Sequence, residues 1–213
     1  DNTWGTPLYL KPLKIGFDLS FCSATKYFSG HSDAMGGSLA VNKKVFKKVM
    51  FFYKLSGYRM SADEAYLIIR GLRTLDVRLK KHYENTKMII NFLKKQKKIK
   101  EILYPHNPSS KNFKLWKKYY SGANGLFSIV IKSKNKSSVI KFVNSLKLFG
   151  IGYSWGGFES LALLQDLRTK TKYTEARKYF RFAKDEHIVR LHIGLEDPKD
   201  LINDLKKSLR YIK

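Results

Sequence analysis

Residues 23–37 read SATKYFSGHSDAMGG, and this stretch decides how the rest of the chain is interpreted. The run FDLSFCS, residues 17–23, leads into it and has the length and the following turn signal of a short strand. Lys26 therefore stands where a strand gives way to a loop, with hydroxyl residues before it and glycines after it. Hydroxyl groups and the peptide N–H groups of such a turn can bind an anion.

The surroundings of Lys26 suggest one particular chemistry. A lysine beside an anion site, with its pKa lowered by burial or by neighbouring cations, suits Schiff-base formation. Ser23 and Thr25 would supply the anion-binding hydroxyls. A pyridine cofactor at such a site also needs an acid that keeps its ring nitrogen protonated, and Asp1, in DNTW, lies one α/β step upstream. On these residues alone, an ordinary surface lysine remains the alternative.

The composition indicates a folded chain. It has 213 residues, of which 43% are hydrophobic, so we expect one sizeable domain or two small ones. No apolar run reaches the length of about 18 residues that a membrane-spanning helix needs. The single cysteine, Cys22, excludes an internal disulfide framework and fits a reducing compartment, so we expect a cytoplasmic location. The chain begins at Asp1 without a methionine or a signal-peptide pattern, so we expect a piece of a longer protein.

The chain is strongly basic. Its formal net charge is +25, from 42 basic and 17 acidic residues, and clustered basic residues would suit a nucleic-acid partner. The lysines instead recur on expected helix faces and ends, as in 43–48 and 94–100, and no zinc-finger, RNA-recognition or KH motif is present. We interpret the charge as compositional and expect no specific nucleic acid. A basic nucleic-acid-binding module stays open as an alternative of a different class.

Hydrophobic periodicity divides the first part of the chain into strands and helices. The predicted order is strand 17–23, strand 36–42, helix 43–57 and one long helix 61–96. Gly57 ends the first helix, because glycine readily takes the left-handed conformation of a helix C-terminus. Ser61 and Glu64 form a capping box at the start of the long helix, and Gly71 is a bend or boundary within it.

The second part has the pattern of a small α+β domain. We expect strands at 100–105, 125–132 and 187–194, a helix at 136–148, and a terminal helix that Asp197 caps and Pro198 begins. Along the last strand, Val189, Leu191 and Ile193 face one way, while Ile188, Arg190 and His192 face the other. Arg190 is therefore predicted on a polar face.

Several kinds of catalytic site are not indicated. None of the five histidines stands at a zinc-ligand spacing, so no metal site is expected. The nucleophile elbow, the dinucleotide fingerprint and the P-loop are also missing from the sequence. GGFES, residues 156–160, could form a tight turn, but two glycines are weak support. Cys22 lies within a strand pattern and is expected to be an inert core thiol.

Five motifs occur in a defined order: DNTW at 1–4, SATKYFSGHSDAMGG at 23–37, GLRTLDVRL at 71–79, YSWGGFESL at 153–161 and RLHIGLED at 190–197. In this combination the chain, from Asp1 to Lys213, resembles the Cys/Met-metabolism family of pyridoxal-phosphate enzymes of fold type I. The resemblance covers only the C-terminal portion of such enzymes.

This resemblance implies an α/β fold. Residues 1–72 would be the remainder of an aspartate-aminotransferase-like large domain that binds the cofactor. Residues 73–213 would form the small C-terminal α+β domain, and a long helix would join the two. Most strands of the large-domain sheet would be missing, so we expect residues 1–72 to leave an unpaired edge and an exposed apolar face.

The resemblance also implies roles for single residues. Lys26 would hold pyridoxal 5'-phosphate covalently and later move protons. Asp1 would be the partner of the pyridinium nitrogen, and Ser23 and Thr25 would bind the phosphate. Arg190 would clamp the substrate α-carboxylate, for which a fork of donors is suited. A structural salt bridge is the alternative role of Arg190.

The segment YSWGG would complete the site. Ser154 and Trp155 would orient the carboxylate and the catalytic lysine and close the site, while Tyr153 would shape the substrate preference. Core packing is the alternative role of Trp155. Members of the family that act at Cγ typically have leucine after the serine, so Trp155 favours the branch that acts at Cβ.

The implied activity is the β-elimination of cystathionine to homocysteine, pyruvate and ammonia, a carbon–sulfur lyase reaction of methionine biosynthesis. The implied partners are a small amino-acid substrate and either a homo-oligomer, typically a tetramer, or an N-terminal half-chain. No membrane partner is expected. An inactive remnant and a γ-acting trans-sulfuration enzyme stay open as alternatives.

Overall fold

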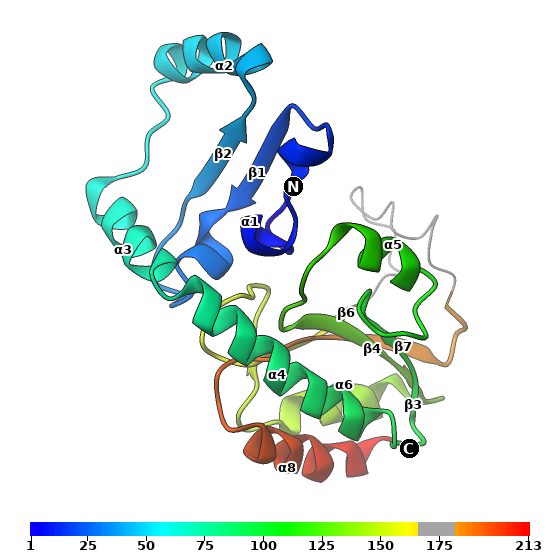
Figure 1. Ribbon diagram of the computed structural model, residues 1–213. Helices are drawn as coiled ribbons and strands as arrows, with labels where there is room; N and C mark the ends of the chain where they lie inside the picture. Colours follow the sequence, from blue (N-terminus) through cyan, green and yellow to red (C-terminus); the bar gives the residue numbers. More distant parts are fainter. Residues whose placement is uncertain (166–181) are drawn as a thin grey trace.

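The structure is a computed structural model that describes residues 1–165 and 182–213 (Figure 1). Its N-terminal part is built on an antiparallel ribbon of two strands, β1 (Leu19–Ser23) and β2 (Gly37–Val41). Leu19 pairs with Val41 and Ser23 with Gly37, so the ends of both strands meet at the loop that carries Lys26. Both predicted strands are confirmed.

Short helical turns surround this ribbon. They are α1 (Thr6–Tyr9), the 3₁₀ turn η1 (Pro12–Ile15) and the π-helical turn η2 (Ala24–Phe28). The loop predicted after the first strand is therefore a turn of π-helix. Lys26 itself departs from helical geometry, with φ −89° and ψ −121°. The strand that ends at Ser23 thus passes directly into the turn that presents Lys26.

The predicted helix stops and caps are present. α2 (Lys43–Ser56) begins at Asn42 and ends at Gly57, whose φ is +67°. The Ser61 side chain accepts from the backbone N–H of Glu64 at 3.2 Å and caps α3 (Ala62–Leu72). These ends depend on local hydrogen bonds, which is why the sequence predicts them well.

The prediction of one long helix over 61–96 is wrong. The structure has two helices, α3 and α4 (Leu75–Leu93), with a break between them. The hydroxyl of Thr74 and the guanidinium of Arg78 donate hydrogen bonds to the carbonyl oxygen of Gly71, at 3.1 and 2.7 Å. These bonds satisfy a carbonyl at the end of α3 and let the chain turn there. The break lies close to Gly71, where a bend was predicted.

The C-terminal part contains a five-stranded sheet in the order β3-β4-β7-β6-β5. Its strands are β3 (Ile99–Leu103), β4 (Leu126–Lys132), β5 (Gly150–Ile151), β6 (Leu161–Gln165) and β7 (Glu186–His192). Its helices are α5 (Phe113–Tyr119), α6 (Lys136–Ser145), α8 (Pro198–Ser208) and the 3₁₀ turn η3 (Leu209–Tyr211). All neighbouring strands are antiparallel except β5 and β6. Sequence periodicity predicted β3, β4, β7, α6 and α8, but it missed β5, β6 and α5.

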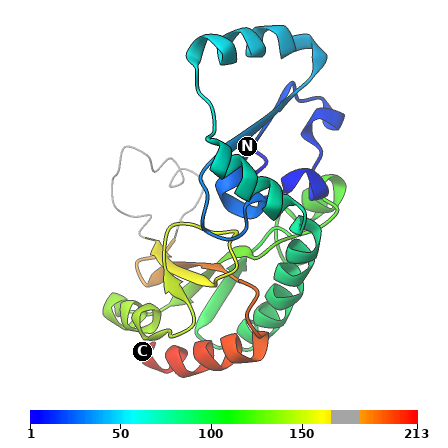
Figure 2. The same cartoon turned by 90° about the vertical axis from the view of Figure 1, so that its left-hand side faces the viewer.

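One face of this sheet forms the larger core. Helices α4, α6 and α8 lie along the sheet, with α8 (red) at the bottom of the molecule in Figure 2. Val189, Leu191 and Ile193 are fully buried there, together with Leu201 and Leu205 of α8. Burial of each such side chain stabilises the fold by about 2 kcal/mol. The predicted apolar stripe of the last strand and that of the terminal helix are therefore both in the core.

The opposite face of β7 is also covered. Ile188 is buried and His192 is only 1% exposed, although the alternation placed both on the polar side of the strand. Arg190 is partly exposed between them. The alternation correctly separates the two faces, but this second face looks toward the Lys26 turn and its covering loop instead of toward water.

Two hydrophobic clusters share helix α4. Leu75 and Leu79, at its start, pack with Tyr27 and the Lys26 turn, whereas Ile89 and Leu93, near its end, pack in the sheet core. This helix therefore ties the two parts of the chain together. The domain boundary between residues 72 and 73 stays a prediction.

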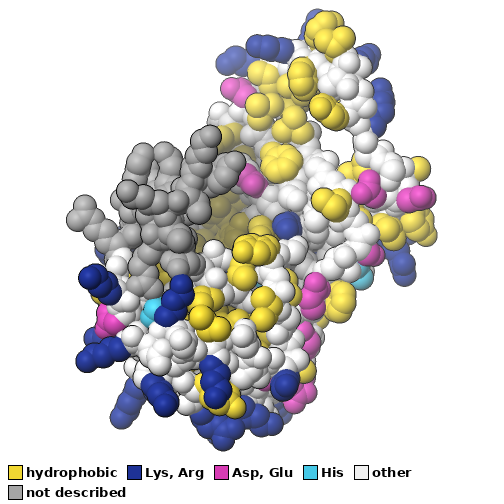
Figure 3. All heavy atoms as spheres, turned by 180° about the vertical axis from the view of Figure 1, so that it is seen from behind, with side chains coloured by type: hydrophobic (Ala, Val, Ile, Leu, Met, Phe, Trp, Pro, Cys, Tyr) yellow, Lys and Arg dark blue, Asp and Glu magenta, His cyan; other side chains and the backbone are white. Residues whose placement is uncertain are grey.

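The ribbon of β1, β2 and α2 leaves an apolar groove uncovered, which we call the α2 groove. It is a cavity of about 430 Å³ whose lining includes Phe21, Leu39, Phe46, Phe52 and Tyr53. Phe52 is 64% exposed, and α2 contains no buried residue. Hydrophobic side chains gather at this end of the molecule in Figure 3. The expected exposed apolar face is therefore present.

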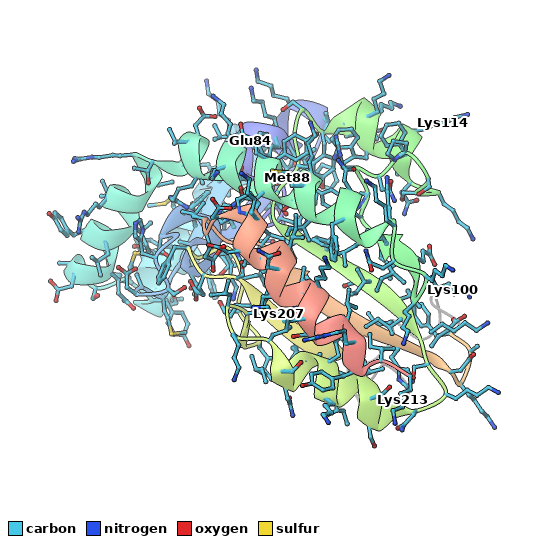
Figure 4. The ribbon with its side chains drawn as sticks, turned by 90° about the horizontal axis from the view of Figure 1, so that it is seen from below. Glu84, Met88, Lys100, Lys114, Lys207 and Lys213 are labelled. Atoms are coloured by element: carbon cyan, nitrogen blue, oxygen red, sulfur yellow. The ribbon has the colours of Figure 1, made fainter. Side chains whose placement is uncertain are left out.

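Basic side chains project from the helices and the chain end. Lys114, Lys207 and Lys213 are exposed, and Figure 4 shows such side chains radiating from the ribbon. Lys100 differs, because it pairs with the carboxylate of Glu186. Of the helices in the described ranges, none has the combined length and apolar character that would let it cross a membrane.

Gly71→Ala is expected to destabilise the fold. A Cβ at this position would lie 2.2 Å from the carbonyl oxygen of Ser29 and 2.3 Å from that of Phe28, so backbone would have to move. We expect the free energy of unfolding, measured in urea, to fall by about 2 kcal/mol or more. Gly152→Ala is the matched control, because its Cβ would meet Leu161 at an ordinary 3.5 Å. Equal losses in the two variants would contradict the close approach of α3 to the turn.

Candidate active site

The turn that carries Lys26 is fixed to the start of β2. The backbone N–H groups of Ala24 and Thr25 donate to the carbonyl of Gly36 at 2.8 and 3.3 Å. The hydroxyl of Thr25 accepts from the N–H of Gly36 at 3.0 Å. Thr25 therefore bonds to the backbone of Gly36, and in this structure its hydroxyl links the turn to the start of β2.

Arg78 holds the other end of the same turn. Its guanidinium donates to the carbonyl oxygens of Tyr27 at 2.9 Å and Gly71 at 2.7 Å, and its Nε donates to the hydroxyl of Thr74. The side chain is only 5% exposed, and burial lowers its pKa. Sequence reasoning gave Arg78 no role, although it lies in the motif GLRTLDVRL. A basic residue on an otherwise apolar helix face was the available signal.

The amine of Lys26 meets residues from a distant part of the chain. Its Nζ donates to the hydroxyl of Ser154 at 2.9 Å and lies 5.7 Å from the centre of the Trp155 ring. Burial, and then the nearby positive charge of Arg190, lower the pKa of Lys26. A lowered pKa raises the neutral fraction of the amine at a given pH, and the neutral amine is the nucleophilic form.

Arg190 holds the segment that supplies Ser154. Its Nη2 donates to the carbonyl oxygens of Gly152, Tyr153 and Ser154, at 3.2, 2.6 and 3.3 Å. Tyr153 thus contributes its backbone, while its side chain is 81% exposed. Within the described ranges Arg190 has no ion pair with a carboxylate, so the salt-bridge alternative is not what the geometry favours.

Ser23 is the last residue of β1, and Asp1 lies on the segment beside that strand. The N–H of Asn2 donates to the carbonyl of Phe21 at 2.7 Å, and the N–H of Ser23 donates to the hydroxyl of Thr3 at 2.8 Å. The carboxylate of Asp1 accepts from the N–H of Thr3 at 2.7 Å. Of the predicted residues, the structure thus brings Lys26, Ser154, Trp155 and Arg190 together and holds Asp1 and Ser23 along the adjoining strand.

Sequence reasoning missed a buried group beneath Lys26. Tyr27 is 1% exposed, and its ring lies edge-on to His82, Trp155 and His192 at centroid distances of 5.5, 5.6 and 6.0 Å. Its hydroxyl accepts from the N–H of Gly125 at 3.2 Å. The residue next to the reactive amine is therefore anchored in the sheet domain. Tyr27 and His192 do lie in quoted motifs, which was the only signal for them.

These residues fit a cofactor with an aldehyde and an acidic phosphate. Among the described residues, the Lys26 amine bonds to a hydroxyl and to no carboxylate, so no carboxylate fixes its charge. Its lowered pKa suits condensation with a carbonyl group. Arg190 adds a positive charge beside it for an anionic substrate group. Hydroxyl groups adjoin the amine on the chain through Ser23 and Thr25, whose backbone N–H groups already donate to Thr3 and Gly36.

Comparison with known proteins assigns the chain to a family. The family model of Cys/Met metabolism PLP-dependent enzymes matches residues 1–210, so the chain belongs to this family, which depends on pyridoxal phosphate. A putative cystathionine β-lyase of Rhizobium johnstonii is 38% identical over 98% of this chain and 52% of its own length. An L-alanine/L-glutamate racemase of Wolbachia pipientis wMel is 39% identical over 98% of this chain and 51% of its own length.

A solved structure shows the same fold. A cystathionine γ-synthase of Xanthomonas oryzae pv. oryzae, in complex with aminoacrylate and cysteine, aligns with a TM-score of 0.89 and 31% identity. The alignment covers 99% of this chain and 54% of that one. The predicted fold is confirmed as an α/β fold of pyridoxal-phosphate trans-sulfuration enzymes. The chain spans about half the length of the relatives that it matches.

Arg190→Met should raise the pKa of Lys26. The substitution removes a cation that lowers this pKa and also releases three carbonyl groups of the covering segment. The fraction of neutral amine at pH 8 should fall about threefold. Reductive methylation of Lys26 across a pH series, followed by peptide mass spectrometry, measures this change.

Arg210→Met is the control for this experiment. Arg210 is exposed and bonds only to the carbonyl of Lys207 among described residues, so the titration of Lys26 should not change. An unchanged Lys26 curve in Arg190→Met would contradict the proximity of the two cations.

Proposed function

We propose that the chain is the C-terminal half of a pyridoxal-phosphate-dependent carbon–sulfur lyase that cleaves cystathionine by β-elimination. The observation that carries this proposal is the hydrogen bond between the Lys26 amine and the Ser154 hydroxyl, with Arg190 beside them. The two partners are 128 residues apart in the sequence. Such an arrangement suits a lysine that must be held and yet remain free to move protons.

Each residue would have a defined task. Arg190 binds the α-carboxylate of the amino acid and so sets the orientation of its Cα–H bond. Lys26, as a neutral amine, takes the α-proton, and Ser154 keeps its Nζ in place. The chemistry that bound pyridoxal phosphate supplies is an electron sink for the charge that develops at Cα. Asp1 is proposed to favour the protonated ring nitrogen.

The remaining residues would set access and preference. Ser23 and Thr25 are proposed to receive the phosphate through their side-chain hydroxyls. Trp155 packs on Tyr27 and lies over the Lys26 amine, so it limits the entry of water. Tyr153 is exposed at the rim, where it can contact the distal part of a substrate.

The proposed products follow from elimination at Cβ. Breaking the Cβ–S bond of cystathionine releases homocysteine, and hydrolysis of the remaining three-carbon imine gives pyruvate and ammonia. Trp155, next to Ser154, supports the β-acting assignment. The relatives are named as enzymes that act at either carbon, so the comparisons support the coarser class of trans-sulfuration enzyme.

The site is proposed to need the N-terminal half of the family fold. The α2 groove exposes Phe46 and Phe52, and the ribbon of β1 and β2 has only two strands. A preceding polypeptide, either continuous with Asp1 or a separate chain, would cover this face and extend the ribbon. Assembly as a homo-oligomer of completed units and a cytoplasmic location stay predictions.

Racemisation of a small amino acid is a second candidate function. The relative from Wolbachia that is named a racemase is as similar to this chain as the named lyase. Both reactions begin when the amine of the lysine takes the α-proton. They part afterwards, because racemisation returns a proton to Cα and elimination expels a thiolate from Cβ.

The test uses this chain together with the polypeptide encoded immediately upstream of it. With pyridoxal phosphate added, we expect a visible absorbance band of lysine-bound cofactor and release of pyruvate from cystathionine. Lys26→Ala should abolish both, while Lys207→Ala, which removes an exposed lysine, should retain them. Chiral chromatography of L-alanine incubated with the same sample measures racemisation.

The outcomes separate the alternatives. Pyruvate without D-alanine supports the lyase, and D-alanine without pyruvate supports the racemase. A cofactor band without either product would indicate an inactive remnant. Absence of the band in the wild-type pair would contradict the assignment of Lys26.

A further inference from the structure

The loop that brings Ser154 to Lys26 lies directly against the reactive turn. Gly156 has a φ of +87°, and a Cβ on it would lie 2.8 Å from the backbone nitrogen of Tyr27 and 3.0 Å from the carbonyl carbon of Lys26. Only a glycine allows this approach. A small movement of the loop would therefore move Ser154 relative to the amine of Lys26.

His192 holds this loop from below. Its ring is 1% exposed, and its Nε2 accepts from the N–H of Gly156 at 3.0 Å. The carbonyl of Gly157 lies 3.2 Å from the same nitrogen. A neutral imidazole nitrogen cannot accept and donate at once, so acceptance from Gly156 places the ring proton on Nδ1.

The neighbouring imidazole, that of His82, has its proton on the nitrogen that leaves an acceptor for the donor of His192. His82 lies 5.2 Å from His192 between ring centres, and its Nδ1 is 2.7 Å from the carbonyl of Ile193, to which it must donate. This leaves a lone pair on Nε2 of His82. That atom and Nδ1 of His192 are buried without a hydrogen-bond partner in the described ranges. One ring therefore offers a donor and the other an acceptor.

Both rings are held neutral. Burial, and then the charge of His82, lower the pKa of His192 to about 3, and Arg190 and Lys26 act in the same direction. Burial lowers the pKa of His82 to about 4, and the charge of Arg78 contributes. Nε2 of His192 is thus available as an acceptor across the neutral pH range.

We infer that His192 is a positioning residue of the site: its Nε2 holds the N–H of Gly156 and thereby keeps Ser154 at hydrogen-bonding distance from Lys26. Arg190 and His192 are two residues apart on β7 and fix the two ends of segment 152–157. When Arg190 engages a carboxylate, His192 continues to hold the loop. The reactive role of Lys26 in this inference rests on the proposed function.

The test compares His192→Phe with His192→Gln in this chain, expressed with the polypeptide encoded immediately upstream of it and without added cofactor. Phenylalanine keeps the ring but loses the acceptor, whereas the side-chain amide of glutamine can place an oxygen near Nε2. We expect amide hydrogen exchange at Gly156 to quicken about tenfold in His192→Phe. The pH midpoint of Lys26 methylation should rise by about half a unit as the amine becomes less buried. His192→Gln should restore both toward wild type.

His106→Phe is the matched control. It removes a partly buried imidazole that bonds to the hydroxyl of Tyr83 at 2.9 Å, away from this loop, and should change neither readout. Wild-type exchange and midpoint in both His192 variants would overturn the inference, and so would a glutamine variant that behaves like the phenylalanine variant. If His192→Phe does not fold, His192→Gln decides: near-wild-type readouts support the inference, and loosened ones overturn it. These readouts involve no cofactor, so they hold or fail independently of the lyase proposal.

Discussion

The close packing of the Gly156 backbone on the peptide between Lys26 and Tyr27 is the contact on which the site depends. Tyr27 is anchored by its hydroxyl to Gly125 in the sheet domain, and Gly156 is held by His192. The reactive amine therefore projects from a turn that is clamped between two parts of the chain. The distance from this amine to Ser154 depends on how these contacts hold the turn and the loop together, more than on the flexible side chain of the lysine.

Arg78, a buried cation without a carboxylate partner among the described residues, also stabilises the turn that carries Lys26. Arg78 gathers the carbonyl oxygens of Tyr27 and Gly71 around one guanidinium, and it has no ion pair among the described residues. Carbonyl dipoles that converge on a positive charge offset part of its desolvation. The same bonds explain why the helical pattern of 61–96 is interrupted where it is. The break between α3 and α4 and the shape of the lysine turn thus both depend on the hydrogen bonds of Arg78.

The distribution of apolar and charged surface distinguishes the two parts of the molecule. In the sheet domain, the helices cover the hydrophobic core, and the basic side chains project outward. The ribbon that carries Lys26 instead exposes the α2 groove, and no residue of α2 is fully buried. An uncovered apolar face of this kind marks an interaction site. It agrees with a chain that spans about half the length of its relatives.

Local features were determined by the sequence itself. The strand before Lys26, the stop at Gly57, the caps at Ser61 and Asp197 and the stripe of α8 all depend on neighbours within a few residues. The order of the five motifs was sufficient to indicate the family and the candidate residues. These inferences need no knowledge of the path of the chain.

Only the tertiary structure decided which of these residues meet. The bond from Lys26 to Ser154 spans 128 residues, and that from Arg78 to Tyr27 spans 51. His192 looked like one more polar position on an alternating strand, yet the loop over it makes it a buried acceptor. The strand β5 has only two residues, which are too few to show a period. The sequence of β6, LALLQ, begins with four apolar residues in a row and therefore shows no alternation of polar and apolar positions. Such contacts depend on how the chain returns on itself, which residue spacing does not encode.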